Sequence, residues 1–138
     1  MKAYLGIGTN LGDRAANLHR AVEMINEQAG HVLACSSFMK TEPWGFTSDN
    51  AFLNAVVEVD TPHTPYELLH ITQKIEREMG RAHKSINGNY TDRIIDIDIL
   101  LYGDESINEP DLIIPHPLMW QRSFVYEPLW EIAPHLKP

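Results

Sequence analysis

Two acidic residues in one short stretch are the strongest candidates for chemistry in this sequence. Asp96 and Asp98 stand where isoleucine alternates strictly with polar residues. Such alternation of β-branched residues predicts a strand, in which successive side chains point to opposite faces. Ile95, Ile97 and Ile99 would then enter a core, and the two carboxylates would lie side by side on the other face.

Two carboxylates so close repel each other, and a divalent cation between them would remove that cost. Carboxylate oxygens are hard ligands that suit Mg²⁺, which takes one or two of them and completes its shell with water and substrate phosphates. The alternative is that both aspartates simply face solvent on an open antiparallel sheet. The rest of the chain favours the metal.

Basic residues are grouped on either side of this strand. Arg81, His83 and Arg93 precede it, and His116 and Arg122 follow it. Magnesium and arginine act together on polyphosphates, since phosphate oxygens bridge the metal ions while guanidinium groups neutralise the remaining charge. The stretch therefore predicts a polyphosphate site.

A second group of residues suits a flat, polar heterocycle. Trp44, Phe52 and Phe124 supply aromatic surface, and Asn54 interrupts an apolar run. The loop aromatic could instead fasten its loop to the core. The Asn54 amide needs hydrogen-bond partners, which are either backbone groups or the edge of a ligand. With the polyphosphate site, this group indicates a transferase with two substrates.

Composition excludes several classes of protein. The chain has 138 residues, 43% of them hydrophobic, and a formal net charge of −8. That charge argues against nucleic acid or an anionic membrane as a partner. No apolar run is long enough to span a membrane, and no signal peptide is evident. The single cysteine suits a reducing compartment. We expect a cytoplasmic monomer consisting of a single domain, residues 1–138.

The elements that must position these residues follow the order β-α-β-β-α-β. Strands are predicted at 2–8, 31–38, 51–60 and within 92–101. One helix follows Asp13 as N-cap, and a second begins with a capping box at Thr64 and Glu67. This order predicts the α+β, ferredoxin-like fold, an antiparallel sheet with both helices on one face. A C-terminal extension follows, with a short helix capped by Ser123.

Two local patterns carry further expectations. Gly6, Gly8 and Gly12 are interpreted as residues of a tight turn, because their spacing departs from the dinucleotide-binding pattern. Gln73 and Glu76 are three residues apart, and so are expected to share a solvated face of the second helix. RNA-binding modules share the predicted topology, but their aromatic motif and basic surface are missing from the sequence.

The sequence resembles the hydroxymethyl-dihydropterin pyrophosphokinase family of folate biosynthesis over nearly its whole length. The matching segments are 4–13, 41–45, 52–55, 80–81, 92–101 and 115–117, together with Arg122. The resemblance implies transfer of diphosphate from ATP to the hydroxymethyl group of 6-hydroxymethyl-7,8-dihydropterin, with release of AMP. ATP and a reduced pterin are therefore the expected partners.

The resemblance also implies roles for individual residues. Asp96 and Asp98 match the family's ligands for two Mg²⁺ ions, and with Arg81 and Arg93 they form the expected catalytic group. His83 stands where some members carry arginine. Positions that match the nucleotide site are Gln73, Glu76, Arg81, His83, Arg93, Ile99, Leu112, His116 and Arg122. Positions that match the pterin site are Thr41, Glu42, Trp44, Phe52, Asn54 and Phe124.

Two other functions fit the same residues. One is a different magnesium-dependent phosphoryl or nucleotidyl transferase, which would release ADP or form a nucleotidyl adduct. The other is a ligand-sensing domain, which would bind nucleotide without turnover.

Overall fold

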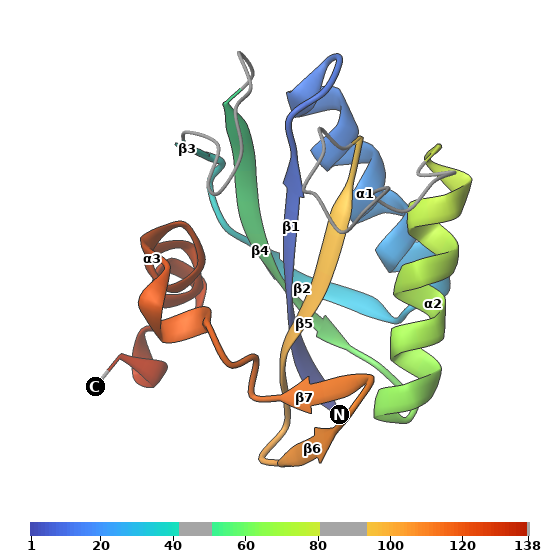
Figure 1. The fold of residues 1–138 in the computed structure, drawn as a ribbon, viewed down its shortest axis with the longest axis vertical. Coiled ribbons are helices and arrows are strands. Elements are labelled where there is room, and N and C mark those ends of the chain that lie inside the picture. The colour runs from blue at the N-terminus through green and yellow to red at the C-terminus, as the bar shows by residue number, and fades with distance from the viewer. Residues whose placement is uncertain (42–50, 81–93, 138) are drawn as a thin grey trace.

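An antiparallel sheet forms the core, and its strands and helices follow the predicted βαββαβ order. The structure is a computed structural model that describes residues 1–41, 51–80 and 94–137. Strand order in the sheet is β2-β4-β1-β5, and β3 pairs with β4 (Figure 1). The elements of this core are β1 (Lys2–Thr9), α1 (Arg14–Gln28), β2 (His31–Cys35), β3 (Met39–Thr41), β4 (Phe52–Asp60), α2 (Pro65–Glu78) and β5 (Asp96–Tyr102). The order confirms the ferredoxin-like prediction.

The C-terminal segment adds a hairpin and a third α-helix to this core. Its elements are β6 (Ile107–Glu109), β7 (Leu112–Ile114), the 3-10 turn η2 (Met119–Gln121), α3 (Ser123–Ile132) and the 3-10 turn η3 (Pro134–Leu136). Strands β6 and β7 pair antiparallel in a sheet of their own. The predicted Ser123 cap is wrong: Ser123 is the first helical residue, and Arg122, at the N-cap, makes no side-chain capping bond.

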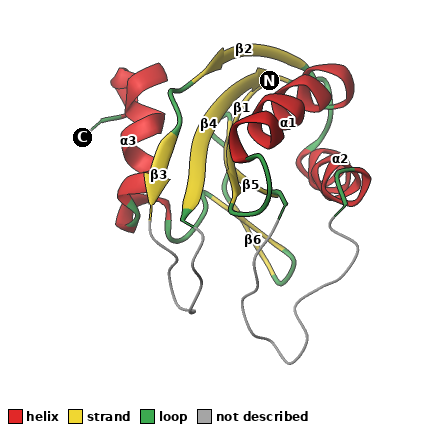
Figure 2. Ribbon diagram, turned by 90° about the horizontal axis from the view of Figure 1, so that it is seen from above, coloured by secondary structure: helices red, strands yellow, loops and turns green. Residues whose placement is uncertain are grey.

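Local sequence explains where α1 and α2 begin. The Asp13 carboxylate accepts a hydrogen bond from the Ala16 amide at 3.1 Å, as predicted for an N-cap. At α2, Thr64 and Glu67 form the predicted reciprocal capping box. Both helices pack on the same face of the sheet (Figure 2), where side chains such as Leu5 are fully buried.

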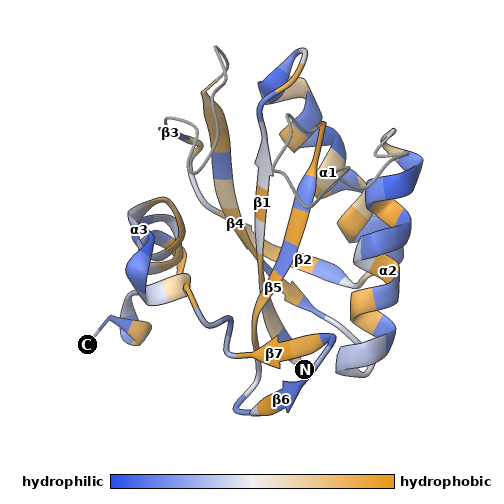
Figure 3. Ribbon diagram, viewed as in Figure 1, coloured by the Kyte–Doolittle hydropathy of each residue, from blue (hydrophilic) through white to orange (hydrophobic). Residues whose placement is uncertain are grey.

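The opposite face of the sheet is covered over only part of its length. Tyr4, Val56 and Leu100 on this face form a second apolar cluster with Met119 and Leu129 of the C-terminal segment. Strands β4 and β5 carry hydrophilic bands that interrupt their hydrophobic runs, with the pale strand β1 between them (Figure 3). The second face is thus apolar where α3 packs on it, and beyond α3 it carries polar side chains of β4 and β5.

The predicted second strand, 31–38, is wrong in its last part. The chain leaves β2 after Cys35, and a separate strand, β3, then joins the same edge of β4. Ser36 explains the break, because its Oγ accepts the Val56 amide hydrogen at 2.9 Å and donates to the Ser37 carbonyl. A side chain that bonds nearby backbone in this way competes with the regular strand ladder.

A β-bulge in β5 adjusts which face its side chains enter. Leu5 of β1 faces Ile99, whereas the preceding residue, Tyr4, faces Leu101, so Leu100 is the extra residue. Leu100 is buried in the cluster beneath α3.

Among the described residues, no helix combines the length and apolar character that crossing a membrane requires.

Candidate active site

The aspartate strand has the predicted alternation. Ile95, Ile97 and Ile99 are at most 6% exposed and belong to the core under α1 and α2. Asp96 and Asp98 are half-buried and occupy the alternate positions, on the opposite face. They lie beyond the part of that face that α3 covers. The two carboxylates are therefore neighbours on an accessible sheet surface, as the sequence predicted.

Strand β1 lies beside these carboxylates, and at Gly6 and Gly8 it presents bare main chain to this face of the sheet, a surface called here the glycine floor. Asp96 pairs with Gly8, and Asp98 pairs with Gly6. Gly6 and Gly8 therefore lie within β1, which confirms the predicted strand 2–8, and their interpretation as turn residues is wrong. A Cβ at Gly8 would come within 2.7 Å of Asn54 Oδ1, so only glycine leaves this side chain in place. The floor joins the aspartates of β5 to the polar end of β4.

Three of the residues predicted for the pterin site, Thr41, Phe52 and Asn54, lie on the other side of this floor. Asn54 pairs with Gly8 across the strands and is 8% exposed. Its Nδ2 donates to Thr41 Oγ1 at 3.0 Å, which orients the amide. Phe52 pairs with Thr41 on β3 and lies against the Gly8 position. The structure thus brings Thr41, Phe52 and Asn54 together, with an aromatic surface next to an oriented amide.

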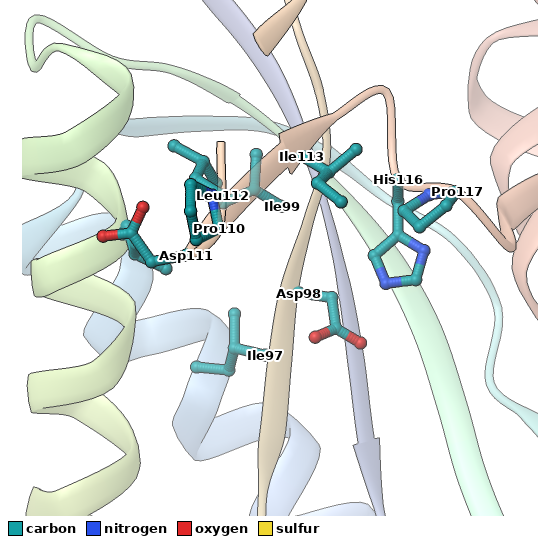
Figure 4. A pocket seen from close by; sticks show the side chains of 10 residues that line it. Ile97, Asp98, Ile99, Pro110, Asp111, Leu112, Ile113, His116 and Pro117 are labelled. Carbon is teal, nitrogen blue, oxygen red and sulfur yellow. The ribbon is translucent and has the colours of Figure 1, made fainter. Parts of the chain in front are cut away.

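A pocket of about 260 Å³ lies along the outer edge of β5. Four residues predicted for the metal and nucleotide sites line it: Asp98, Ile99, Leu112 and His116. The carboxylate of Asp98 and the imidazole of His116 lie on the side of β5 away from Ile97 (Figure 4). Apolar walls with a few converging polar groups are typical of a small-molecule site.

The surroundings of His116 favour its neutral form. The Leu118 amide donates to its Nδ1 at 3.3 Å, so this nitrogen acts as an acceptor. Burial lowers the pKa of His116, and the positive charge of Arg122 lowers it further, while Asp96 opposes the shift. Arg122 in turn lies over the Phe124 ring, 5.7 Å from its centroid. Asp96, His116, Arg122 and Phe124 therefore belong to one neighbourhood.

The lowered pKa of His116 predicts how stability depends on pH. The unfolded chain binds this proton near pH 6.5 and the folded protein only at lower pH, so stability rises with pH through that interval. We expect urea denaturation between pH 5 and 7.5 to give wild type a steeper rise in unfolding free energy than His116→Gln. Parallel curves for the two proteins would contradict this expectation.

Gln73 and Glu76 on helix α2 differ in their exposure to solvent. Gln73 is exposed, as expected, but Glu76 is only 8% exposed, and its Oε2 accepts the Ile97 amide hydrogen at 2.8 Å. The predicted shared solvated face is therefore wrong for Glu76. Residues three apart on a helix differ by about 60° in direction, enough to lie on opposite sides of a packing boundary.

Several predicted residues lie outside the described part of the chain. These are Glu42, Trp44, Arg81, His83 and Arg93. Sequence reasoning in turn missed two features of the site: the bare floor at Gly6 and Gly8, and the Thr41 hydroxyl that orients Asn54. Glycines two residues apart in an otherwise apolar strand were the available signal for the floor.

The donor set on β5 fits magnesium bound together with a substrate. Within 1–41, 51–80 and 94–137, no three His, Cys, Asp or Glu side chains are arranged to hold a metal ion, so this part of the chain would offer a metal the two aspartate carboxylates. This is the number that Mg²⁺ uses when phosphates and water complete its shell. The half-buried position of both carboxylates leaves them accessible to such a ligand.

The fold and this surface define a class: a ferredoxin-like α+β domain with an acidic, ligand-sized site on its sheet. Residues 4–134 match the family model of 7,8-dihydro-6-hydroxymethylpterin-pyrophosphokinase (HPPK). The chain belongs to this family.

Individual relatives agree with this assignment. The 2-amino-4-hydroxy-6-hydroxymethyldihydropteridine pyrophosphokinase of Porphyromonas gingivalis is 52% identical over 136 residues, 98% of this chain and 92% of that protein. The enzyme of the same name from Bacillus subtilis is 42% identical over 95% of this chain and 77% of its own length.

Among solved structures, wild-type Plasmodium falciparum HPPK-DHPS is similar with a TM-score of 0.73 and 18% identity. The similarity covers 99% of this chain and 40% of that one. At this level of identity the match shows the fold alone. It agrees with the ferredoxin-like order of strands found here.

Proposed function

We propose that the protein transfers diphosphate from ATP to the hydroxymethyl group of 6-hydroxymethyl-7,8-dihydropterin in folate biosynthesis. Family membership over residues 4–134 supports the reaction. The observation that carries it at the site is the carboxylate pair on β5, which faces Asn54 across the glycine floor of β1. The groups proposed to bind the phosphates and the heterocycle would thus share one sheet surface.

In this reaction the hydroxyl oxygen of the pterin forms a bond to the β-phosphorus of ATP. The bond between that phosphorus and the oxygen bridging to the α-phosphate breaks, and AMP leaves with the bridging oxygen. The hydroxyl proton is released. Such transfers depend mainly on positioning and charge neutralisation, so the protein needs no covalent nucleophile.

On the phosphate side, Asp96 and Asp98 would hold two Mg²⁺ ions, which neutralise phosphate charge when bound. Arg81 and Arg93 would engage the phosphates. The pocket beside β5 would take the nucleotide, with Ile99 and Leu112 as its apolar walls and His116 as a polar group. Arg122, whose charge acts on His116, would add a cation next to it. Gln73 and His83 would contribute further contacts to the nucleotide.

On the pterin side, Asn54 would read the polar edge of the ring. An amide offers one acceptor and two donors, and the bond to Thr41 already uses one donor. Phe52 and Phe124 would stack on the ring faces, and the chain around Glu42 and Trp44 would add further contacts. The proposed state is a cytoplasmic monomer.

A product assay tests this function directly. The protein is mixed with ATP, MgCl₂ and 6-hydroxymethyl-7,8-dihydropterin, and nucleotides are separated by anion-exchange chromatography. We expect AMP to form in step with pterin diphosphate, and EDTA to stop both. ADP as the product would contradict diphosphate transfer, and bound ATP without turnover would indicate a sensor.

A further inference from the structure

We propose that Glu76 is a positioning residue that fixes the aspartate pair by holding the peptide between them from the outer edge of β5. The proposal rests on the function above, because it concerns the geometry of the same two carboxylates. It assigns Glu76 a role that differs from nucleotide contact, the role that its match to the family implies.

Burial is the first observation. Glu76 is 8% exposed, although the neighbouring Gln73, Lys74 and Arg77 on α2 are exposed. A carboxylate is costly to bury unless hydrogen bonds compensate it. Its Oε2 accepts the Ile97 amide hydrogen at 2.8 Å, and hydrogen bonds to an ionised group are the stronger kind.

The register of β5 shows why this particular amide matters. Ile97 faces Ile7 across an antiparallel pair, in which hydrogen-bonded and non-hydrogen-bonded positions alternate. Since the Ile97 amide bonds Glu76, it points away from β1. Asp96 and Asp98 then occupy the alternate positions, whose main-chain groups point toward β1.

The aspartate segment is therefore held from both sides. Strand β1 holds the main chain of Asp96 and Asp98, and Glu76 holds the residue between them. In the described sheet β5 is an edge strand, so no further strand supplies that second contact. Loss of the Glu76 bond would let the edge of β5 shift, and small misplacements of reacting groups cost about a hundredfold in rate.

Two variants separate positioning from nucleotide contact. Glu76→Ala removes the acceptor, whereas Glu76→Gln keeps an oxygen that can accept the Ile97 amide hydrogen, loses the charge and exchanges the second oxygen for an NH2 donor. We expect Glu76→Ala to exchange the Ile97 amide hydrogen at least about tenfold faster, measured by NMR, and to lower kcat by about ten- to a hundredfold. Its half-saturating Mg²⁺ concentration should rise as well.

Glu76→Gln is expected to protect the Ile97 amide better than Glu76→Ala does and to recover most of the kcat that Glu76→Ala loses, because a neutral oxygen still accepts this hydrogen bond, although more weakly than a carboxylate. Glu78→Ala, an exposed glutamate on the same helix, is the matched control and should change none of these values. A Glu76→Gln protein with a protected Ile97 amide and a strongly raised KM for ATP would overturn the proposal. So would unchanged exchange at Ile97 in Glu76→Ala.

The exchange measurement needs no turnover, which keeps this proposal separate from the proposed reaction. If wild type forms no AMP, the reaction fails, whatever the exchange data show. If wild type is active and Glu76→Ala does not fold, Glu76→Gln still decides between the two roles. A third outcome is a folded Glu76→Ala protein in which the Ile97 amide exchanges fast but kcat is unchanged. This outcome would refute the positioning role and leave the proposed reaction standing.

Discussion

Asp96→Asn should lower the rate of AMP formation by about a thousandfold or more while the fold stays intact. The exchange removes one of two adjacent carboxylates and keeps side-chain size. Metal-assisted charge neutralisation contributes several kcal/mol to such a transfer, and each 1.36 kcal/mol is tenfold in rate. Steady-state kinetics at saturating ATP and pterin, over a range of Mg²⁺ concentrations, measures the loss.

The control for this variant is Asp104→Asn. Asp104 is an exposed aspartate just after β5, outside the proposed site, so its rate should equal that of wild type. Unfolding free energy should not fall in Asp96→Asn, since one source of repulsion between like charges is removed. Retention of more than about a tenth of the wild-type rate in Asp96→Asn would contradict the metal assignment.

Gly8→Ala should weaken pterin binding by about ten- to a hundredfold, the cost of one or two lost polar contacts. The added methyl group would lie 2.7 Å from Asn54 Oδ1, so the Asn54 amide must move from the position that Thr41 gives it. ATP binds on the other side of the floor in the proposed site, and its affinity should change by less than about threefold. Calorimetric titration with each ligand separates the two effects.

Gly6→Ala supplies the contrast on the same strand. A Cβ at Gly6 would lie 3.5 Å from Leu100 Cδ2, an ordinary van der Waals distance, and it does not touch Asn54. Its effect on pterin affinity should therefore be smaller. Equal losses in the two variants would mean that any side chain on the floor obstructs the ligand, and that Asn54 is not the cause.

Much of this fold could be predicted because its signals are local. Alternation of isoleucine and aspartate determined which face each side chain of β5 enters. The capping box at Thr64 and the cap at Asp13 marked the starts of two helices, since each satisfies free amide groups next to it in the chain. The order of elements then left few topologies to consider.

The errors involve contacts between residues far apart in the sequence. Ser36 ends β2 because its hydroxyl accepts the amide hydrogen of Val56, which the local pattern does not show. Glu76 is buried because β5 lies beside it, and the spacing on α2 carries no information about that strand. The roles of Gly6 and Gly8 likewise depend on side chains from other strands, Leu100 of β5 beside Gly6 and Asn54 of β4 beside Gly8.

Because α3 covers part of the second sheet face, it limits how far the chain can be shortened before the protein associates with itself. Each of three strands carries an apolar residue beneath α3 and a residue of the proposed site further along: Tyr4 and Gly8, Val56 and Asn54, Leu100 and Asp96. A chain shortened to the βαββαβ core would expose the apolar residues as one patch. Such patches promote association between molecules.

The βαββαβ core is enough to form the carboxylate pair. A longer chain, one that includes α3, is needed to keep this core from associating in water. Segment 115–137 adds Met119 and Leu129 to the cluster, and this effect on colloidal behaviour is additional to the ligand contacts proposed for His116, Arg122 and Phe124 in the same segment. A shortened protein would show the loss of cover as concentration-dependent light scattering, a readout that needs no ligand.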